Sequence, residues 1–184
     1  MKTLVSATIT ICLSTMPILA ESTVADRYRI SLVDIDGTTL STADGRETII
    51  VLTSKANVDK ASVVGDRVPD FCLGNPNYRM ITVVSFEPGH SAPVRAVLKS
   101  AIRHRLDAEG RRLQKRYDKL KIVHDARSEV FAVADFDGAV TAQLKSKWSA
   151  DLFHVFVFGK SGELIDQWSD VPSAEQLSSA LKHD

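Results

Sequence analysis

Cysteine chemistry is the chemistry that this sequence restricts most. The chain holds two cysteines, Cys12 in an apolar N-terminal stretch and Cys72 shortly before Asn75-Pro76, a pair that interrupts regular secondary structure. If the N-terminal stretch is removed, Cys72 remains as a single thiol and cannot form a disulfide within the chain. We interpret Cys72 as a small buried hydrophobic residue. Two alternatives stay open, a catalytic thiol at Cys72 and a disulfide from Cys72 to a second copy.

No pattern of residues indicates a metal or cofactor site. The histidines are scattered, and none stands beside a cysteine or a second histidine at the spacing of a metal-ligand set; they are His90, His104, His124, His154 and His183. A glycine-rich phosphate loop, a serine elbow and a His-Glu metal helix are absent from the sequence. We therefore expect neither a bound metal nor a cofactor.

The first twenty residues have the composition of a secretory signal peptide. Lys2 is their only charge, residues 4–19 are mostly apolar, and the polar sequence begins at Glu21 after Ala20. The apolar run is shorter than the ~20 residues that a membrane span needs, so we expect cleavage near Ala20 rather than anchoring. This predicts a signal peptide over residues 1–20, a single domain over 21–184, no transmembrane span after cleavage, and a periplasmic or secreted location.

The overall composition predicts a folded domain without a strong charge. Hydrophobic residues make up 44% and charged residues 25%, and 23 basic residues balance 23 acidic ones. Such a chain can bury a core, and its charge balance gives no general attraction to nucleic acid or anionic membranes. We expect a protein or small-molecule partner and no nucleic acid.

One segment departs from this balance. Residues 95–121 contain ten Lys and Arg against three acidic residues. One interpretation is a docking face for an acidic partner, formed by Arg103, Arg111, Arg112, Lys115 and Arg116. The other, which we favour, is a solvated helix face partly neutralised by acidic neighbours.

Apolar patterns along the chain predict alternating strands and helices. A hairpin is expected over residues 28–40, strands over 48–53, 79–86, 153–158 and 164–168, and a short apolar run over 131–134. Helices are expected over 57–64, 140–147 and 174–182, with a long one that starts after Ser91 and that Gly110 divides. The long helix is expected to bury one face, made of Val94, Val97, Leu98, Ala101, Ile102, Leu106, Leu113, Tyr117 and Leu120.

Three segments carry a family resemblance. Residues 30–37 with the turn Asp36-Gly37, a second turn at Asp44-Gly45 and the run 49–52 form one pattern, and residues 135–138 and 156–165 form two more. Their order and spacing resemble thioredoxin-like domains of the redoxin type, such as TlpA-like thiol-disulfide reductases and AhpC/TSA peroxiredoxins. The resemblance implies an α/β fold, a thioredoxin-like mixed β-sheet flanked by helices, with an N-terminal β-hairpin.

The redox active site of these families is missing from this sequence. In such proteins the redox cysteines follow the central strand, where a helix N-terminus lowers the thiol pKa, and a cis-proline stands opposite. Here Thr53, Ser54, Lys55 and Asn57 occupy the first place as a vestigial redox loop, and residues 151–153 contain no proline. We predict an exported, redox-inactive binding or accessory module rather than an enzyme. The alternative is a one-cysteine thiol peroxidase or oxidoreductase that uses Cys72.

A remote alternative uses carboxylates instead of sulfur. The segment from Asp34 to Thr38 resembles the nucleophile motif of haloacid-dehalogenase-type phosphatases, and residues 51–54 and 65–70 resemble the later motifs. Asp34 would attack phosphorus, Asp36 would act as acid and base, and Mg²⁺ would be required. The spacing argues against this, because that fold needs several βα units of roughly thirty residues each between the first and last motifs.

Overall fold

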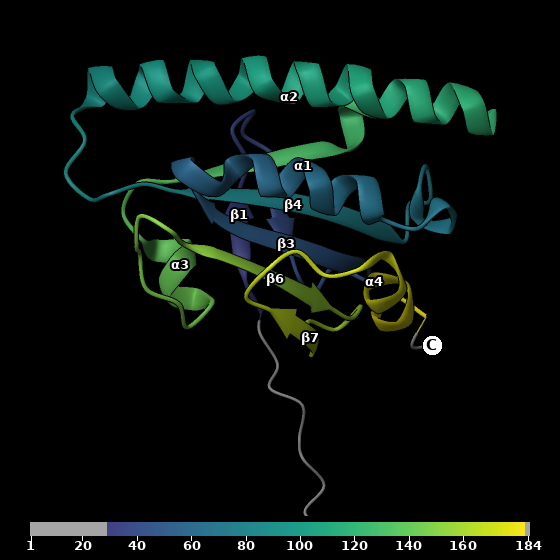
Figure 1. Cartoon of the computed structure of the whole chain (residues 1–184). Helices are drawn as coiled ribbons and strands as arrows, with labels where there is room; N and C mark the ends of the chain where they lie inside the picture. Colours follow the sequence, from purple (N-terminus) through teal and green to yellow (C-terminus); the bar gives the residue numbers. More distant parts are fainter. Residues whose placement is uncertain (1–28, 183–184) are drawn as a thin grey trace, which may run out of the picture.

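A five-stranded mixed sheet forms the centre of the protein (Figure 1), for which the computed structural model describes residues 29–182. The predicted signal peptide, its cleavage site near Ala20 and Cys12 lie outside the described residues. Within residues 29–182, no helix is long and apolar enough to cross a membrane.

The strand order of the sheet is β5-β4-β3-β6-β7. Its strands are β3 (Glu47–Ser54), β4 (Tyr78–Ser85), β5 (Val130–Asp135), β6 (Phe153–Phe158) and β7 (Leu164–Trp168). The first three are parallel, whereas β6 and β7 pair antiparallel to their neighbours. The predicted strands over 48–53, 79–86, 153–158 and 164–168 are confirmed, and the short apolar run at 131–134 is a full edge strand.

The central strand β3 is buried at all eight positions. It pairs with β4 on one side and β6 on the other, and both of its faces are covered. This is why its sequence is a continuous β-branched and apolar run rather than an alternating one.

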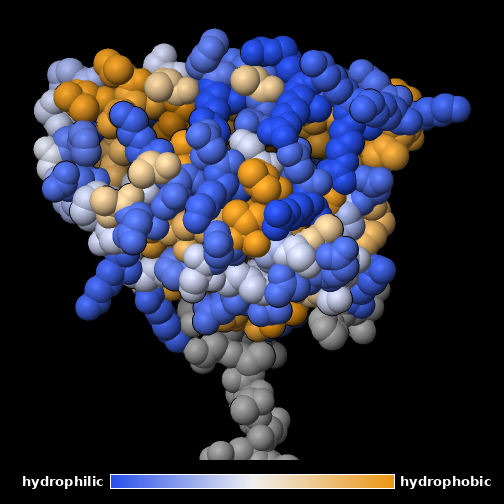
Figure 2. Space-filling view, viewed as in Figure 1, coloured by the Kyte–Doolittle hydropathy of each residue, from blue (hydrophilic) through white to orange (hydrophobic). Residues whose placement is uncertain are grey.

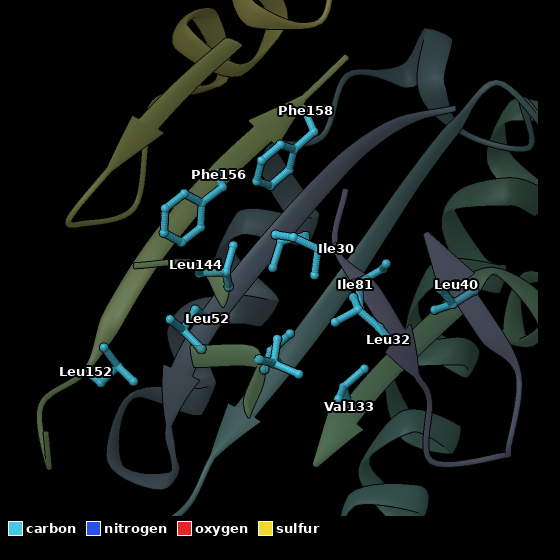
Figure 3. Packing of buried hydrophobic residues seen from close by; sticks show 13 residues of the cluster. Ile30, Leu32, Leu40, Leu52, Ile81, Val133, Leu144, Leu152, Phe156 and Phe158 are labelled. Carbon is cyan, nitrogen blue, oxygen red and sulfur yellow. The ribbon is translucent and has the colours of Figure 1, made fainter. Parts of the chain in front are cut away.

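An N-terminal hairpin covers one face of the sheet (Figure 3). Strands β1 (Ser31–Val33) and β2 (Thr39–Ser41) form a separate antiparallel pair. Their inward residues Leu32 and Leu40 pack in the same cluster as Ile81 of β4 and Phe158 of β6. The short helix α3 (Ala139–Gln143) joins this layer. It is shorter than predicted, because Lys145 has a φ of 52°, a left-handed conformation that an α-helix cannot include.

Helices α1 (Val58–Arg67) and α4 (Ala174–Ala180) cover the opposite face. Val64 and Leu177 pack with Val51 of β3 in a second core cluster. The start of α4 is fixed by a capping box. The Ser173 hydroxyl accepts from the Gln176 backbone N–H, and the Gln176 side-chain carbonyl accepts from the Ser173 backbone N–H. These two helices confirm the predicted ones, with α1 extending three residues beyond the expected end.

The long helix α2 (Ala92–Leu120) is unbroken over 29 residues, so the expected division at Gly110 is wrong. A Cβ at Gly110 would lie 3.1 Å from the Arg127 Cα, in the 3₁₀ turn η3 (Ala126–Glu129). Glycine is therefore required here by close packing of α2 on η3, not by a change of chain direction.

The predicted apolar face of α2 is only partly buried. Leu106 and Tyr117 are buried, whereas Val94, Val97 and Leu120 are 44%, 69% and 40% exposed. A 29-residue helix is about 44 Å long and an eight-residue strand about 26 Å. The ends of α2 therefore extend beyond the layer beneath them (Figure 1), and the residues there have no surface to pack against.

Two glycine substitutions test this packing with opposite signs. Gly110→Ala should lower the free energy of unfolding by about 1–3 kcal/mol, because the added methyl overpacks the contact with Arg127. Gly65→Ala in α1 should raise it by about 0.5–1 kcal/mol, because the new Cβ meets only the Met80 side chain at 3.9 Å. Urea unfolding monitored by circular dichroism measures both, and equal effects would contradict the assignment of Gly110.

Candidate functional site

The vestigial redox loop lies at the carboxyl end of β3 and is tied to the segment before β6. The Ser54 backbone N–H donates to the Leu152 carbonyl at 2.9 Å, and the Ser54 Oγ donates to the Ala150 carbonyl at 2.7 Å. The Asn57 side-chain amide donates to the Asp151 carbonyl at 2.8 Å. Three successive carbonyls are thus bound by residues of the loop.

This arrangement closes the corner where the resemblance places a redox site. Thr53 is fully buried and Ser54 is 3% exposed. Every peptide bond within residues 29–182 is trans, including those of the segment 150–152. The Ser54 hydroxyl and the Asn57 amide hold the two chain segments together, and neither group can form a disulfide.

Polar side chains at the ends of the neighbouring strands also hold chain segments together. Ser54, Ser85 and Asp135 stand in register at the carboxyl ends of β3, β4 and β5. The Asp135 carboxylate accepts from the Thr141 backbone N–H at 2.9 Å and from the Thr141 hydroxyl at 2.6 Å. Ser85 lies 2.9 Å from the same hydroxyl. The buried row of polar side chains therefore fixes α3 to the sheet.

Cys72 lies at the opposite end of the sheet from Ser54. It ends the 3₁₀ turn η2 (Asp70–Cys72), close to the start of β3, and the two ends of that strand are separated by about 23 Å. Its side chain is 6% exposed and packs in the α1–α4 core cluster. Burial, with a contribution from the Glu47 carboxylate, raises the pKa of the Cys72 thiol to about 12. At neutral pH it is a protonated thiol.

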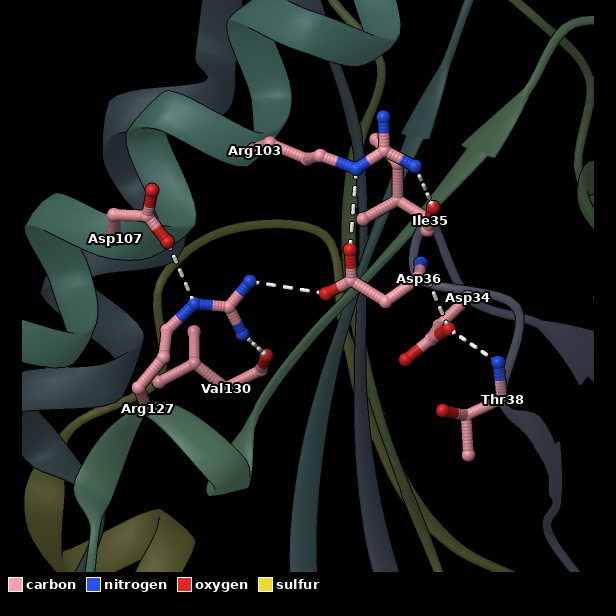
Figure 4. A network of polar contacts seen from close by, with 8 residues as sticks. All are labelled: Asp34, Ile35, Asp36, Thr38, Arg103, Asp107, Arg127 and Val130. Atoms are coloured by element: carbon pink, nitrogen blue, oxygen red, sulfur yellow. Dashed lines mark hydrogen bonds and ion pairs between the residues drawn. The ribbon is translucent and has the colours of Figure 1, made fainter.

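The Asp34–Thr38 segment forms a turn rather than a phosphate site (Figure 4). The Asp34 carboxylate accepts from the Asp36 N–H at 3.0 Å and from the Thr38 N–H at 2.7 Å. Asp36 forms ion pairs with Arg103 at 3.1 Å and Arg127 at 3.0 Å. The hydrogen bond from Arg127, and then that from Arg103, holds the pKa of Asp36 below its usual range. Both carboxylates are thereby engaged within the fold.

The other segments that resemble phosphatase motifs are not gathered around Asp34. Residues 51–54 end the central strand, residues 65–70 end α1, and the Asp34 turn hydrogen-bonds through Ile35 to Ala132 on the edge strand β5. In the part of the chain that the structure describes, no group of three His, Cys, Asp or Glu side chains could hold a metal ion. The motif is accounted for as a structural turn.

The basic helix is partly neutralised on its flanks. Of the five candidate partner-binding residues, Arg103 pairs with Asp36, Arg112 with Asp66, and Arg116 with Asp70 at 2.5 Å. The other two, Arg111 and Lys115, are exposed and form no ion pair among residues 29–182. The partners are 46 to 67 residues away in sequence.

Polar contacts join α2 to α1 along one edge. This edge, which we call the α1–α2 polar row, pairs Asp59 with Arg105, Ser62 with Glu109, Asp66 with Arg112 and Asp70 with Arg116. On its other edge, α2 is held by the Asp36 network through Arg103 and by the ion pair between Asp107 and Arg127 at 2.9 Å. Charged side chains therefore attach the helix on both sides.

Between these two edges lies a cavity of about 640 Å³, bounded by α1, α2 and the sheet. Its walls include Ala61 and Gly65 of α1, Met80 of β4 and Leu106 of α2, and Lys55 of the vestigial redox loop lies on its border. No sequence pattern predicts this space, because a cavity depends on the distance between a helix and a sheet. The small residues at positions 61 and 65 are the sequence signal that bears on it.

Comparison with solved structures assigns the class of fold. The pneumococcal exposed lipoprotein thioredoxin Etrx1 of Streptococcus pneumoniae matches with a TM-score of 0.51 and 14% identity over 85% of this chain and 99% of that chain. A thioredoxin-like protein from Aeropyrum pernix matches with a TM-score of 0.50 and 17% identity over 85% of this chain and 90% of that chain. No family model and no curated protein matches the sequence. The chain has a thioredoxin-like fold.

The arrangement of strands and helices is the one that the sequence predicted. The hairpin β1–β2 precedes a mixed sheet with helices on its faces, as the resemblance of residues 30–37, 135–138 and 156–165 implied. The sequence departs from the redox proteins of this class in having no Cys-x-x-Cys pair.

The closed corner predicts a measurable loss on removing one hydroxyl. Ser54→Ala should lower the free energy of unfolding by about 0.5–1.5 kcal/mol, because it removes a partly buried hydrogen bond to the Ala150 carbonyl. Ser100→Ala, on the exposed surface of α2, is the matched control and should change stability by less than about 0.5 kcal/mol. Equal stability of the two variants in urea would show that the corner is open.

The thiol of Cys72 should be inert in the folded protein. With a pKa near 12, its thiolate fraction at pH 8 is negligible, and the thiolate is the reactive form. A chromogenic disulfide reagent should therefore label Cys72 slowly in buffer and rapidly in guanidinium chloride. Immediate stoichiometric labelling of the native protein would contradict the buried position.

Proposed function

We propose that this protein is an exported thioredoxin-like module that acts by binding rather than by electron transfer. The observation that carries the proposal is the hydrogen bonding of Ser54 and Asn57 to the carbonyls of residues 150–152. A thioredoxin-type site needs a reactive sulfur at that corner, and here the groups that replace it fasten the two segments together. The fold is kept and its redox chemistry is not.

The position of Cys72 supports the same proposal. A one-cysteine peroxidase needs a thiolate that a peroxide can reach, and low thiol pKa values arise at helix N-termini or beside cations. Cys72 instead lies in an apolar cluster, where burial raises its pKa. The Glu47 carboxylate also opposes ionisation, and this effect exceeds the opposite effect of Arg116.

Export is proposed from the composition of residues 1–20. A basic start, a short apolar region and a small residue before the cleavage site are typical of a secretory signal. A solved structure of similar fold, Etrx1, is described as an exposed lipoprotein. The fold is therefore compatible with a location outside the cytoplasm.

Reductase and peroxidase assays test the proposal directly. The exported form should give no insulin reduction with dithiothreitol and no peroxide consumption above the rate without protein. Cys72→Ser should behave like the unaltered protein in both assays, because no step depends on the thiol. Turnover that disappears in Cys72→Ser would replace this proposal with a one-cysteine enzyme.

A further inference from the structure

The cavity between α1, α2 and the sheet has the properties of a ligand site rather than of a packing defect. Its volume of about 640 Å³ lies within the ~300–1,000 Å³ range of small-molecule sites. Protein interiors are otherwise packed as densely as organic crystals. Water would find few polar partners along walls such as Ala61, Met80 and Leu106. An apolar ligand fills such a space with favourable contacts.

The cavity is long and narrow in its direction along α2. The helix residues on its border extend from Leu98 to Tyr117, a span of about 28 Å at the rise of an α-helix. The two rows of charged contacts on either edge of α2 limit its width. Figure 2 shows apolar surface among the hydrophilic side chains of this face. A single extended acyl chain matches these proportions better than a compact ring system does.

Charged side chains of both signs line the far end of the cavity. At the far end the Glu47 and Glu129 carboxylates line the space, with Glu129 bound to the Tyr117 hydroxyl and to His124 at 3.1 Å. Burial, together with the hydrogen bond to Glu129, raises the pKa of Tyr117 above its usual range. Four arginines line the same end, and three of them are already paired with Asp44, Asp66 and Asp70; they are Arg46, Arg79, Arg112 and Arg116. A ligand carboxylate placed there would compete with acidic side chains that are already in place.

The near end carries a cation. Lys55 lines the cavity beside Val58 and Leu98 and is exposed, so the cavity reaches solvent at this end. Among residues 29–182 no acidic side chain lies within ion-pair distance of the Lys55 amine, whereas Arg105, the next cation on the border, is paired with Asp59 at 2.6 Å. The residue that remains of the redox loop thus supplies the one border cation at this end that is not committed to a carboxylate of the described chain.

We propose that the cavity binds one fatty acid, with the acyl chain beneath α2 and the carboxylate at Lys55. This inference rests on the proposed binding function and names its ligand class. The acyl chain would fill the space between Met80 and Leu106. The carboxylate would stay at the solvent border, where it keeps its hydration and avoids the cost of burying a charge.

Calorimetry with monomeric sodium palmitate tests the site in the delipidated, exported form of the chain. We expect binding of one palmitate per protein. Gly65→Leu and Thr82→Leu fill the cavity from the helix side and the sheet side, so each should weaken binding at least tenfold. Ala108→Leu adds a similar side chain on the exposed face of α2 and should leave binding unchanged. Circular dichroism identifies a filling variant that fails to fold, and the other then decides.

The position of the carboxylate has its own control. Lys55→Gln should weaken palmitate about tenfold and leave hexadecanol, which has the same chain and no charge, unaffected. Lys99→Gln removes an exposed lysine of α2 that does not line the cavity and should change neither. Equal losses for both ligands in Lys55→Gln would overturn the assignment of the carboxylate.

The remaining outcomes decide the proposal as a whole. Absence of palmitate binding, or unchanged binding in both folded filling variants, overturns it. Binding to phosphatidylglycerol vesicles without binding of monomeric palmitate also overturns it, because the acyl chains would then be met at a membrane surface. None of these results depends on insulin or peroxide turnover, so failure of the ligand assignment is distinguishable from failure of the redox-inactive proposal.

Discussion

The burial of β3 on both faces and both edges is the constraint on which the rest of the structure depends. Nothing polar can be left unsatisfied where such a strand ends. At its carboxyl end, Ser54 meets this requirement by bonding to the backbone before β6. In a redox protein of this fold the same corner must remain accessible to a partner. Here hydrogen bonds fasten the two segments of this corner together, and Lys55 of the loop remains exposed.

The second helix shows how the domain makes room for a ligand. Apolar packing holds α1 and α4 against the sheet. Helix α2 has apolar contacts through Leu98, Ile102 and Leu106, and charged side chains attach it on both of its edges. Ion pairs of this exposed kind contribute about 0–1 kcal/mol each, so many are needed, and the chain supplies them in rows. Because long charged side chains reach across a gap that apolar ones would have to fill, the helix can stand over an open space.

Much of the fold could be predicted from local patterns, and the site could not. The β-branched runs of β3, β4 and β6 predicted buried strands because burial on both faces leaves a direct signature in the sequence. The role of Gly110 could not be predicted, because glycine is needed there for close contact with Arg127, seventeen residues further along the chain. The pairing of Arg112 and Arg116 was open for the same reason, because Asp66 and Asp70 reach them only after the chain has folded. The vestigial loop was recognised by what it lacks, but its hydrogen bonds to residues 150–152 join segments almost a hundred positions apart.

The attachment of α2 by ion pairs has a consequence for the way the molecule opens. Dissolved salt screens exposed charges but leaves buried apolar contacts largely intact. We therefore expect rising ionic strength to weaken the attachment of α2 more than the packing of β3 and its neighbours. A sheet that stays rigid beneath a helix held by charges gives a guest a way in that does not require the core to unfold.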